Sequence, residues 1–352
     1  MPSMRDPDRN RYLNAVAHIE QEEIPFVELE VDFSVVQGVL GREVPPLSSF
    51  ELPSSTYVEF LKRVGMDMAY IQVPWRLARR CVVDPEGRKV YQEGLLKNDT
   101  EPASIRLPAL DAVEKRIEEI LEALEPTRIG TIYGLETPSL LVNKAINYED
   151  YFLYLREQPE FILDLQKRVD EYVAEVAGLV PRYPIDVIRL DSILCMNIGP
   201  MISLEMMEKF NFPWLEKYSR LIRDNGRIVC LHTDGNITSL IERFVQMGID
   251  VLHPVEVCPG QDIYALKDHY GNRIALHGNI DVGGVLAHGT EDKIRSDVEE
   301  HIRRLGRGGG YICGSSHNIH EQIPTANFLA MVDAIHETRF EISDKPQPGE
   351  CS

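Results

Sequence analysis

Short apolar runs that end in chemically reactive side chains recur in the second half of the chain. Three of them, IVCLHTDG, IDVLHPVE and IALHGNID, lie within residues 227–281. Four to six apolar residues followed by a polar turn and an amphipathic segment are typical of buried parallel strands. Each run therefore predicts a strand with a candidate reactive group at its C-terminal end.

The same alternation of strand and helix extends over the rest of the chain. Further strands are predicted at 25–33, 67–75, 128–137, 185–192 and 308–318. Helical periodicity lies between them, at 8–22, 56–65, 109–124, 137–145, 148–156, 159–179, 203–224, 236–247, 262–270, 291–305 and 325–338. This alternation favours one α/β domain, a single (β/α)8 TIM barrel, over two doubly wound domains. It carries an N-terminal helical extension and, after the second strand, a β-hairpin insertion around Pro85-Glu86-Gly87.

Composition limits the class of protein. The hydrophobic fraction of 43% and charged fraction of 26% are typical of a soluble globular protein. No apolar run approaches the roughly 20 residues that cross a bilayer, and the polar N-terminus has no apolar signal region. We therefore expect a cytoplasmic protein with no membrane span. The barrel domain is expected over 1–341, followed by a disordered polar tail over 342–352.

Charge argues against a nucleic-acid partner. The formal net charge is -19, whereas phosphate binding needs clustered cations. The short run RLARR, residues 76–80, is the one local exception. The six cysteines have no framework spacing, which indicates free thiols.

The strand ends carry a candidate metal site. His232 and Asp234 are two positions apart, so both side chains can point into the same pocket. Alone, the pair equally fits a histidine before an Asx turn. Glu256, His277 and Cys313 follow on the next predicted strands, and imidazole, carboxylate and thiolate are zinc ligands. Three of these with an open position would form a catalytic zinc site, although His277 and Cys313 also fit ordinary buried residues.

Other strand ends suggest catalysis and substrate binding. Asp191 interrupts an apolar strand end and His317 lies in the last loop, so both are candidates for acid–base chemistry. Trp75 with Arg76, and Glu136, are candidates for substrate binding, although Trp75 also fits the core. The glycine-rich loops of P-loop and dinucleotide-binding proteins are absent from the sequence.

Four longer segments carry a family resemblance. They are DVIRLDSILCMNIGPMISLEMMEKF, GRIVCLHTDGNITSLIERFVQMGIDVLHPVE, GNRIALHGNIDV and LGRGGGYICGSSHNIHEQIPTANFLAMVDA. In this order they resemble the uroporphyrinogen decarboxylase-like superfamily and, within it, the corrinoid-dependent methyltransferases of O-demethylase systems. The resemblance implies the barrel fold and a zinc-dependent enzyme. Such an enzyme moves a methyl group from a small methylated substrate, a methyl ether, to the Co(I) corrinoid (cobalamin) of a partner protein.

Two departures from family patterns bear on which branch of the superfamily the chain resembles. The first strand, VELEVDF, is acidic where the decarboxylases have an arginine-rich, carboxylate-binding segment. The thiol-alkylating methyltransferases usually have His-x-Cys-Gly where this chain has His232-Thr233-Asp234-Gly235. The O-demethylase group has a Glu, Glu, His zinc pattern, and Glu256 with His277 resembles its second half, whereas Glu242 is only near the first position.

Several alternatives remain open from the sequence. A metal-free decarboxylase would use Asp191 and His317, and a non-catalytic barrel would only bind a ligand or partner. The sequence does not select the ligands among the five metal candidates, and it does not identify the methyl donor. Barrels of this kind often pair, so a homodimer is among the expected assemblies.

Overall fold

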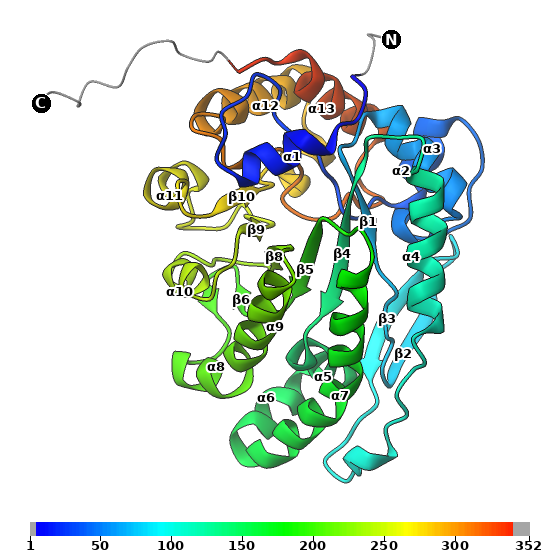
Figure 1. The fold of residues 1–352 in the computed structure, drawn as a ribbon, viewed down its shortest axis with the longest axis vertical. Coiled ribbons are helices and arrows are strands. Elements are labelled where there is room, and N and C mark those ends of the chain that lie inside the picture. Colours follow the sequence, from blue (N-terminus) through cyan, green and yellow to red (C-terminus); the bar gives the residue numbers. More distant parts are fainter. Residues whose placement is uncertain (1–4, 341–352) are drawn as a thin grey trace, which may run out of the picture.

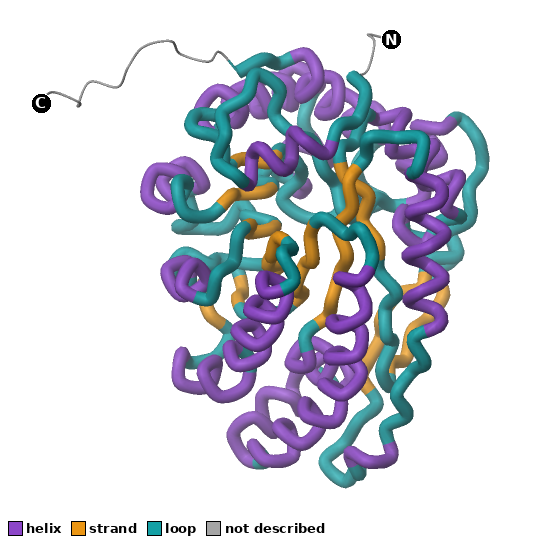
Figure 2. Tube along the Cα trace, viewed as in Figure 1, coloured by secondary structure: helices purple, strands orange, loops and turns teal. Residues whose placement is uncertain are grey.

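A curled sheet of seven parallel strands forms the centre of the protein (Figures 1 and 2). The computed structural model describes residues 5–340. Strand order is β1-β4-β5-β8-β9-β10-β11. The bounds are β1 Met68–Ile71, β4 Gly130–Glu136, β5 Val187–Asp191, β8 Ile228–His232, β9 Val251–His253, β10 Ala275–His277 and β11 Tyr311–Ile312. Helices cover the outside of the sheet (Figure 2). The strands are almost wholly buried, because side chains also fill the inside of the barrel.

Residues 25–31 occupy the eighth position of the barrel. Parallel bridges join Phe26 to Cys313 and Val31 to Ile319, and the Asp67 amide, just before β1, donates to the Phe26 carbonyl at 3.0 Å. This segment therefore lies between the two edges of the sheet and closes it. The (β/α)8 prediction is confirmed, with its first strand reduced to isolated bridges.

Helices surround the sheet in the order expected from the sequence, with one unpredicted helix added at 33–40 (Figure 1). They are α1 Arg9–Val16, α2 Phe33–Leu40, α3 Ser54–Val64, α4 Asp111–Leu124, α5 Pro138–Ala145, α6 Tyr148–Glu157, α7 Pro159–Leu179, α8 Leu204–Phe210, α9 Phe212–Asp224, α10 Ile241–Gln246, α11 Ile263–Tyr270, α12 Glu291–Leu305 and α13 Thr325–Glu337. Short 3-10 or π turns lie at Ser49–Glu51, Pro102–Ser104, Val180–Arg182 and Val282–Leu286. Within residues 5–340, none of these helices has the length and apolar character needed to cross a membrane.

Several predicted elements are shorter in the structure, among them α1, β1, α10 and β11, and two further boundaries differ for an identifiable local reason. The strand predicted for 25–33 ends earlier, because Asp32 accepts from the Ser34 amide at 2.9 Å and caps α2. The helix predicted for 203–224 is divided into α8 and α9 at Asn211. Pro213 lies in the first turn of α9, where it has no amide hydrogen to continue a helix from α8.

Two antiparallel hairpins are added to the barrel. The predicted insertion is β2 Arg79–Val83 with β3 Lys89–Gly94, and it lies beside α5, where the Leu96 amide donates to the Ala145 carbonyl at 2.9 Å (Figure 1). A smaller hairpin, β6 Cys195–Met196 with β7 Gly199–Pro200, follows β5. The predicted disordered tail lies outside the described residues.

Candidate functional site

Polar side chains occupy one level at the C-terminal ends of neighbouring strands. Glu136 pairs in register with Asp191, Asp191 with His232, and His232 with His253. Residues paired in this way point to the same face of a sheet. His277 ends β10 beside His253, with ring centroids 4.5 Å apart. The strand register therefore builds the candidate site.

Asp234, Glu256 and His317 form a candidate metal centre just beyond this level. Each offers a ligand atom, and these atoms lie within 4.8 Å of one another. The Asp234 Oδ1 atom is buried without a hydrogen-bond partner, and the Nε2 atoms of His232 and His317 each lie 3.6 Å from it. These donors come from the loops after β8, β9 and β11, which meet at one mouth of the barrel.

Gly235 brings two of these loops together. Its φ is +83°, and a Cβ atom there would lie 2.6 Å from the Met196 carbonyl oxygen of β6. The Gly235 amide donates to Glu256 Oε2 at 2.5 Å. Burial raises the pKa of Glu256, the Gly235 amide lowers it, and nearby Asp234 raises it again. A cation at this point would relieve the repulsion between the two carboxylates.

Three histidines form a continuous row below the candidate metal centre. The Nδ1 atoms of His232 and His253 lie 2.9 Å apart, so one donates and the other accepts. His277 Nε2 donates to the Val27 carbonyl at 3.0 Å, which leaves its Nδ1 as a bare acceptor. Burial lowers the pKa of His277 to about 4 and those of the other two well below their usual value. The row is therefore neutral at pH 7.

Asp191 is held by a buried arginine. Arg189 Nη2 donates to Asp191 Oδ2 at 2.9 Å, and Gln72 donates to the same oxygen at 3.2 Å. The guanidinium also lies over the Tyr70 ring, 4.3 Å from its centroid. Burial raises the pKa of Asp191 to about 6, whereas Arg189 opposes the shift. Asp191 can therefore exchange a proton near neutral pH.

Glu136 lies between two cations. Lys144 Nζ is 3.1 Å and Arg79 Nη2 3.4 Å from the same oxygen, Oε1. Burial alone would raise the pKa of this carboxyl, but Lys144 and Arg79 together hold it below its ordinary value. Glu136 is therefore an anion at the mouth.

The structure does not gather all the other candidates. Cys313 is fully buried at the bridge to Phe26, and burial raises the pKa of its thiol to about 12. Trp75 packs against Tyr172 of α7, with ring centroids 5.0 Å apart, and Arg76 pairs with Glu51 at 2.8 Å. Trp75 also lines a small cavity together with Gln72 and Glu136, whereas Arg76 is taken up by Glu51.

Glu242 also has a partner away from the site. It lies on the exposed side of α10 and pairs with Arg273 at 2.8 Å. Of the residues predicted from the sequence, the structure thus brings Asp234, Glu256 and His317 together, with His232, His277, Asp191 and Glu136 on the level beneath.

His253 was missed by the sequence reasoning, although the chain carries a signal for it. The strands β8, β9 and β10 all end in the dipeptide Leu-His, and the register aligns the leucines and the histidines. The cations Arg79, Lys144 and Arg189 were missed as well. Arg79 reaches Glu136 from 57 positions away in the sequence, whereas the roles of Lys144 and Arg189 depend on which way their side chains point, which hydrophobic periodicity does not record.

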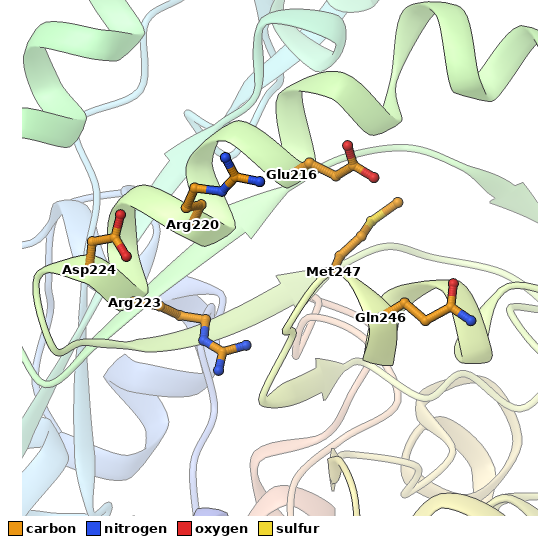
Figure 3. A pocket seen from close by; sticks show the side chains of 6 residues that line it. All are labelled: Glu216, Arg220, Arg223, Asp224, Gln246 and Met247. Atoms are coloured by element: carbon orange, nitrogen blue, oxygen red, sulfur yellow. The ribbon is translucent and has the colours of Figure 1, made fainter.

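A surface pocket of about 440 Å³ lies at the other end of the barrel (Figure 3). It lies where α9 and α10 lead into the starts of β8 and β9. Its lining is of mixed charge: Glu216, Arg220, Arg223, Asp224, Gln246 and Met247. This pocket is therefore separate from the strand ends that carry the candidate site.

Comparison with solved structures agrees with the barrel. A methyltransferase from Methanosarcina mazei superposes with a TM-score of 0.73 at 17% sequence identity, covering 95% of this chain and 99% of that one. At this identity the likeness concerns the fold.

Sequence comparison gives the family. Uroporphyrinogen decarboxylase of Methylococcus capsulatus is 33% identical over 261 residues, which cover 74% of this chain and 67% of that protein. The enzyme of Psychromonas ingrahamii is 34% identical over 76 residues, 22% of this chain and 21% of that protein. The enzyme of Anaeromyxobacter dehalogenans is 28% identical over 135 residues, 38% of this chain and 37% of that protein. These last two matches span well under half of the relatives' length.

The profile of the uroporphyrinogen decarboxylase (URO-D) family matches residues 90–338. This range begins in β3 and ends just after α13, so it includes the strands from β4 to β11 and the loops that carry Asp234, Glu256 and His317. The chain therefore belongs to the uroporphyrinogen decarboxylase (URO-D) family.

Proposed function

We propose that this protein is a zinc-dependent methyltransferase that demethylates a small methyl ether and passes the methyl group to the Co(I) corrinoid of a partner protein. The observation that carries the proposal is the convergence of Asp234, Glu256 and His317 at the barrel mouth. The methyltransferase with the same fold is in keeping with this proposal.

The residues at the mouth fit a zinc ion. Two carboxylates and an imidazole are a ligand set that zinc accepts, with a fourth position left open. The buried Asp234 Oδ1 has no hydrogen-bond partner, which is a costly state for a carboxylate oxygen unless a cation or another donor is present. The sequence suggested His317 for acid–base catalysis, but its place beside Asp234 supports a role as ligand.

His232 has two roles open to it. Its Nδ1 is taken up by His253, while its Nε2 faces Asp234 at 3.6 Å. It can therefore either complete the ligand set or orient Asp234 from the second layer. The depressed pKa of His232 keeps the imidazole neutral and available for either role.

The reaction breaks the bond between the methyl carbon and the ether oxygen. The methyl group goes to Co(I), which supplies both electrons of the new bond and becomes Co(III), while the departing oxygen keeps its electron pair and takes a proton. A bound zinc ion would supply Lewis acidity for that oxygen. Asp191, with a pKa of about 6, is the residue on the polar level that can exchange the proton.

Decarboxylation is the competing function, because the curated relatives are uroporphyrinogen decarboxylases. A polycarboxylate substrate needs several free cations. At the described mouth, Arg189 is paired with Asp191, Arg79 and Lys144 share Glu136, and the segment 25–31 contributes Glu28 and Glu30 instead of arginines, so at most one positive charge is left over. A decarboxylase would also keep its activity after chelation, which separates the two functions.

The test is the metal content of the purified protein by mass spectrometry. About one zinc per chain is expected in the wild type, with loss in Asp234→Ala and His317→Ala. Cys313→Ala and Asp268→Asn, the latter on the exposed side of α11, are matched controls that should keep the metal.

Methyl transfer is then followed in the same preparations. Protein with zinc should convert a Co(I) corrinoid protein to the methyl-Co(III) form in the presence of a methyl ether, as seen in the visible spectrum. Wild type that holds no zinc even after zinc has been offered, or activity that survives chelation, would overturn the proposal.

A further inference from the structure

The wall of the mouth opposite the candidate metal centre carries more positive than negative charge. Arg79 and Lys144 both approach one oxygen of Glu136, so two cations face one carboxylate. The neighbouring Arg189 and Asp191 form a pair of zero net charge. One positive charge is therefore left over at this wall, in a protein whose formal net charge is -19.

Arg79 has unused hydrogen-bonding capacity. Its side chain is only 9% exposed, and its Nε atom is buried without a hydrogen-bond partner. The contact of its Nη2 with Glu136 is long, at 3.4 Å. A buried guanidinium with a free Nε–H can donate to a planar anion through two parallel hydrogen bonds.

Lys144 faces the same space. Its ammonium group is among the charges that lower the pKa of His232, after burial, Arg189 and His317, and it also lowers that of Asp191. It therefore lies within electrostatic reach of the polar level. Glu136 and His232 are two strands apart in register, which places their backbones roughly 10 Å from each other. One ring-sized molecule can span this distance.

Two partly exposed tyrosines lie on the elements next to these cations. Tyr148 begins α6, four residues after Lys144 of α5, and Tyr91 lies in β3, which pairs with the strand β2 that carries Arg79. Their side chains are 42% and 40% exposed. They offer flat apolar surface near the two cations.

We propose that Arg79 and Lys144 form an anion-binding subsite, and that the substrate is a small carboxylic acid whose methylated end points toward Asp234, Glu256 and His317. This inference rests on the proposed function for the role of the methylated end. The subsite itself depends only on the charges of Arg79, Lys144 and Glu136. A ring between the two ends would lie against Tyr91 and Tyr148.

The test compares two ligands that differ in charge, 4-methoxybenzoate and 4-methoxybenzyl alcohol. Calorimetry on the zinc-loaded protein should show at least about tenfold tighter binding of the carboxylate. Arg79→Met and Lys144→Met should each lose most of this preference while keeping zinc and a native circular dichroism spectrum. Arg79→Lys keeps the positive charge but loses the planar guanidinium group, so this variant should retain part of the preference for the carboxylate.

Arg80→Met is the matched control. Arg80 is the next residue of β2, pairs with Glu93 at 2.6 Å and is 59% exposed, so its loss should leave the preference unchanged. Equal affinity of the wild type for the two ligands, or failure to bind either, would overturn the inference. Tighter binding of the carboxylate without any methyl transfer would support the anion-binding subsite and contradict the proposed reaction. Equal methyl transfer from both ligands would contradict the subsite alone.

Discussion

At the scale of single residues, Glu28 has an unusual protonation state. Its carboxyl is buried, and the Ser315 amide donates to its Oε1 at 2.7 Å. Ser315 Oγ contacts Glu28 Oε2 at 2.5 Å and also donates to the His317 carbonyl. A protonated Glu28 can donate to Ser315 Oγ, whose own hydrogen then goes to His317. Burial raises the pKa of Glu28 to about 8, in agreement with this chain of donors.

Glu28→Gln should flatten the pH dependence of stability. The folded protein binds the Glu28 proton more tightly than the unfolded chain, whose glutamate has a pKa of about 4.3. The proton therefore stabilises the wild type at low pH, and this contribution is lost as pH rises toward 8, by up to about 1.4 kcal/mol per pH unit. An amide keeps both hydrogen bonds without titrating.

Denaturant unfolding of wild type and variant between pH 5 and pH 9 measures the difference. As the pH rises across this range, the free energy of unfolding of the variant should increase relative to that of the wild type. A constant difference in the free energy of unfolding would show that Glu28 does not titrate there.

At the scale of elements, the hairpin β2–β3 is tied down at its tip. Arg88 contacts both oxygens of Asp32, at 2.8 and 3.2 Å, and its guanidinium lies over the Phe33 ring at 4.8 Å. Asp32 is also the cap of α2. The tip is thereby fixed to the segment that closes the barrel, and the Arg79 end of the hairpin is fixed at the mouth.

Arg88→Ala should loosen the hairpin while the barrel stays intact. Loss of two charge-assisted hydrogen bonds is expected to speed amide exchange over residues 79–94 about tenfold. Hydrogen–deuterium exchange with mass spectrometry measures this, and Arg80→Ala in the same hairpin serves as control. Equal acceleration in β4 and β5 would indicate global destabilisation instead.

At the scale of the whole molecule, Asp67 holds the closure of the barrel. Its side chain is fully buried and accepts from Arg11 at 2.8 Å, the Phe26 amide at 3.0 Å and the Asp8 amide at 2.8 Å, with Arg5 at 3.5 Å. One carboxylate thus joins the N-terminal segment, the reduced first strand and the start of β1.

Asp67→Asn should cost about 3–5 kcal/mol of unfolding free energy, because it leaves a buried arginine without its counter-charge. Denaturant unfolding measures the loss. Asp164→Asn breaks an exposed ion pair with Lys167 and should leave stability unchanged. A cost for Asp67→Asn as small as that of the control would mean that closure depends on the backbone bridges alone.

Local pattern was sufficient for most of the fold. Apolar runs located β4, β5, β8, β9 and β10, and the turn Pro85-Glu86-Gly87 located the hairpin. It failed at Asn211, where a continuous amphipathic pattern hides a break at Pro213, and at Asp32, where an alternating strand pattern continues into a helix cap. A side-chain cap decides the boundary at Asp32 and a missing amide hydrogen the boundary at Pro213, and apolar periodicity records neither.

The sequence by itself determined the barrel, the strand ends that carry the reactive groups and the candidates among which the site lies. Periodicity expresses burial, and parallel strands necessarily bring their C-terminal ends to one rim. Only the tertiary structure decided which candidates meet: Asp234, Glu256 and His317 converge, while Cys313 is buried at the bridge to Phe26. The structure also placed Arg79 and Lys144 on Glu136. Most of these contacts join positions separated by tens of residues, and Lys144 reaches Glu136 across the turn from β4 into α5. Their distances are set by strand register and helix packing, which apolar periodicity does not contain.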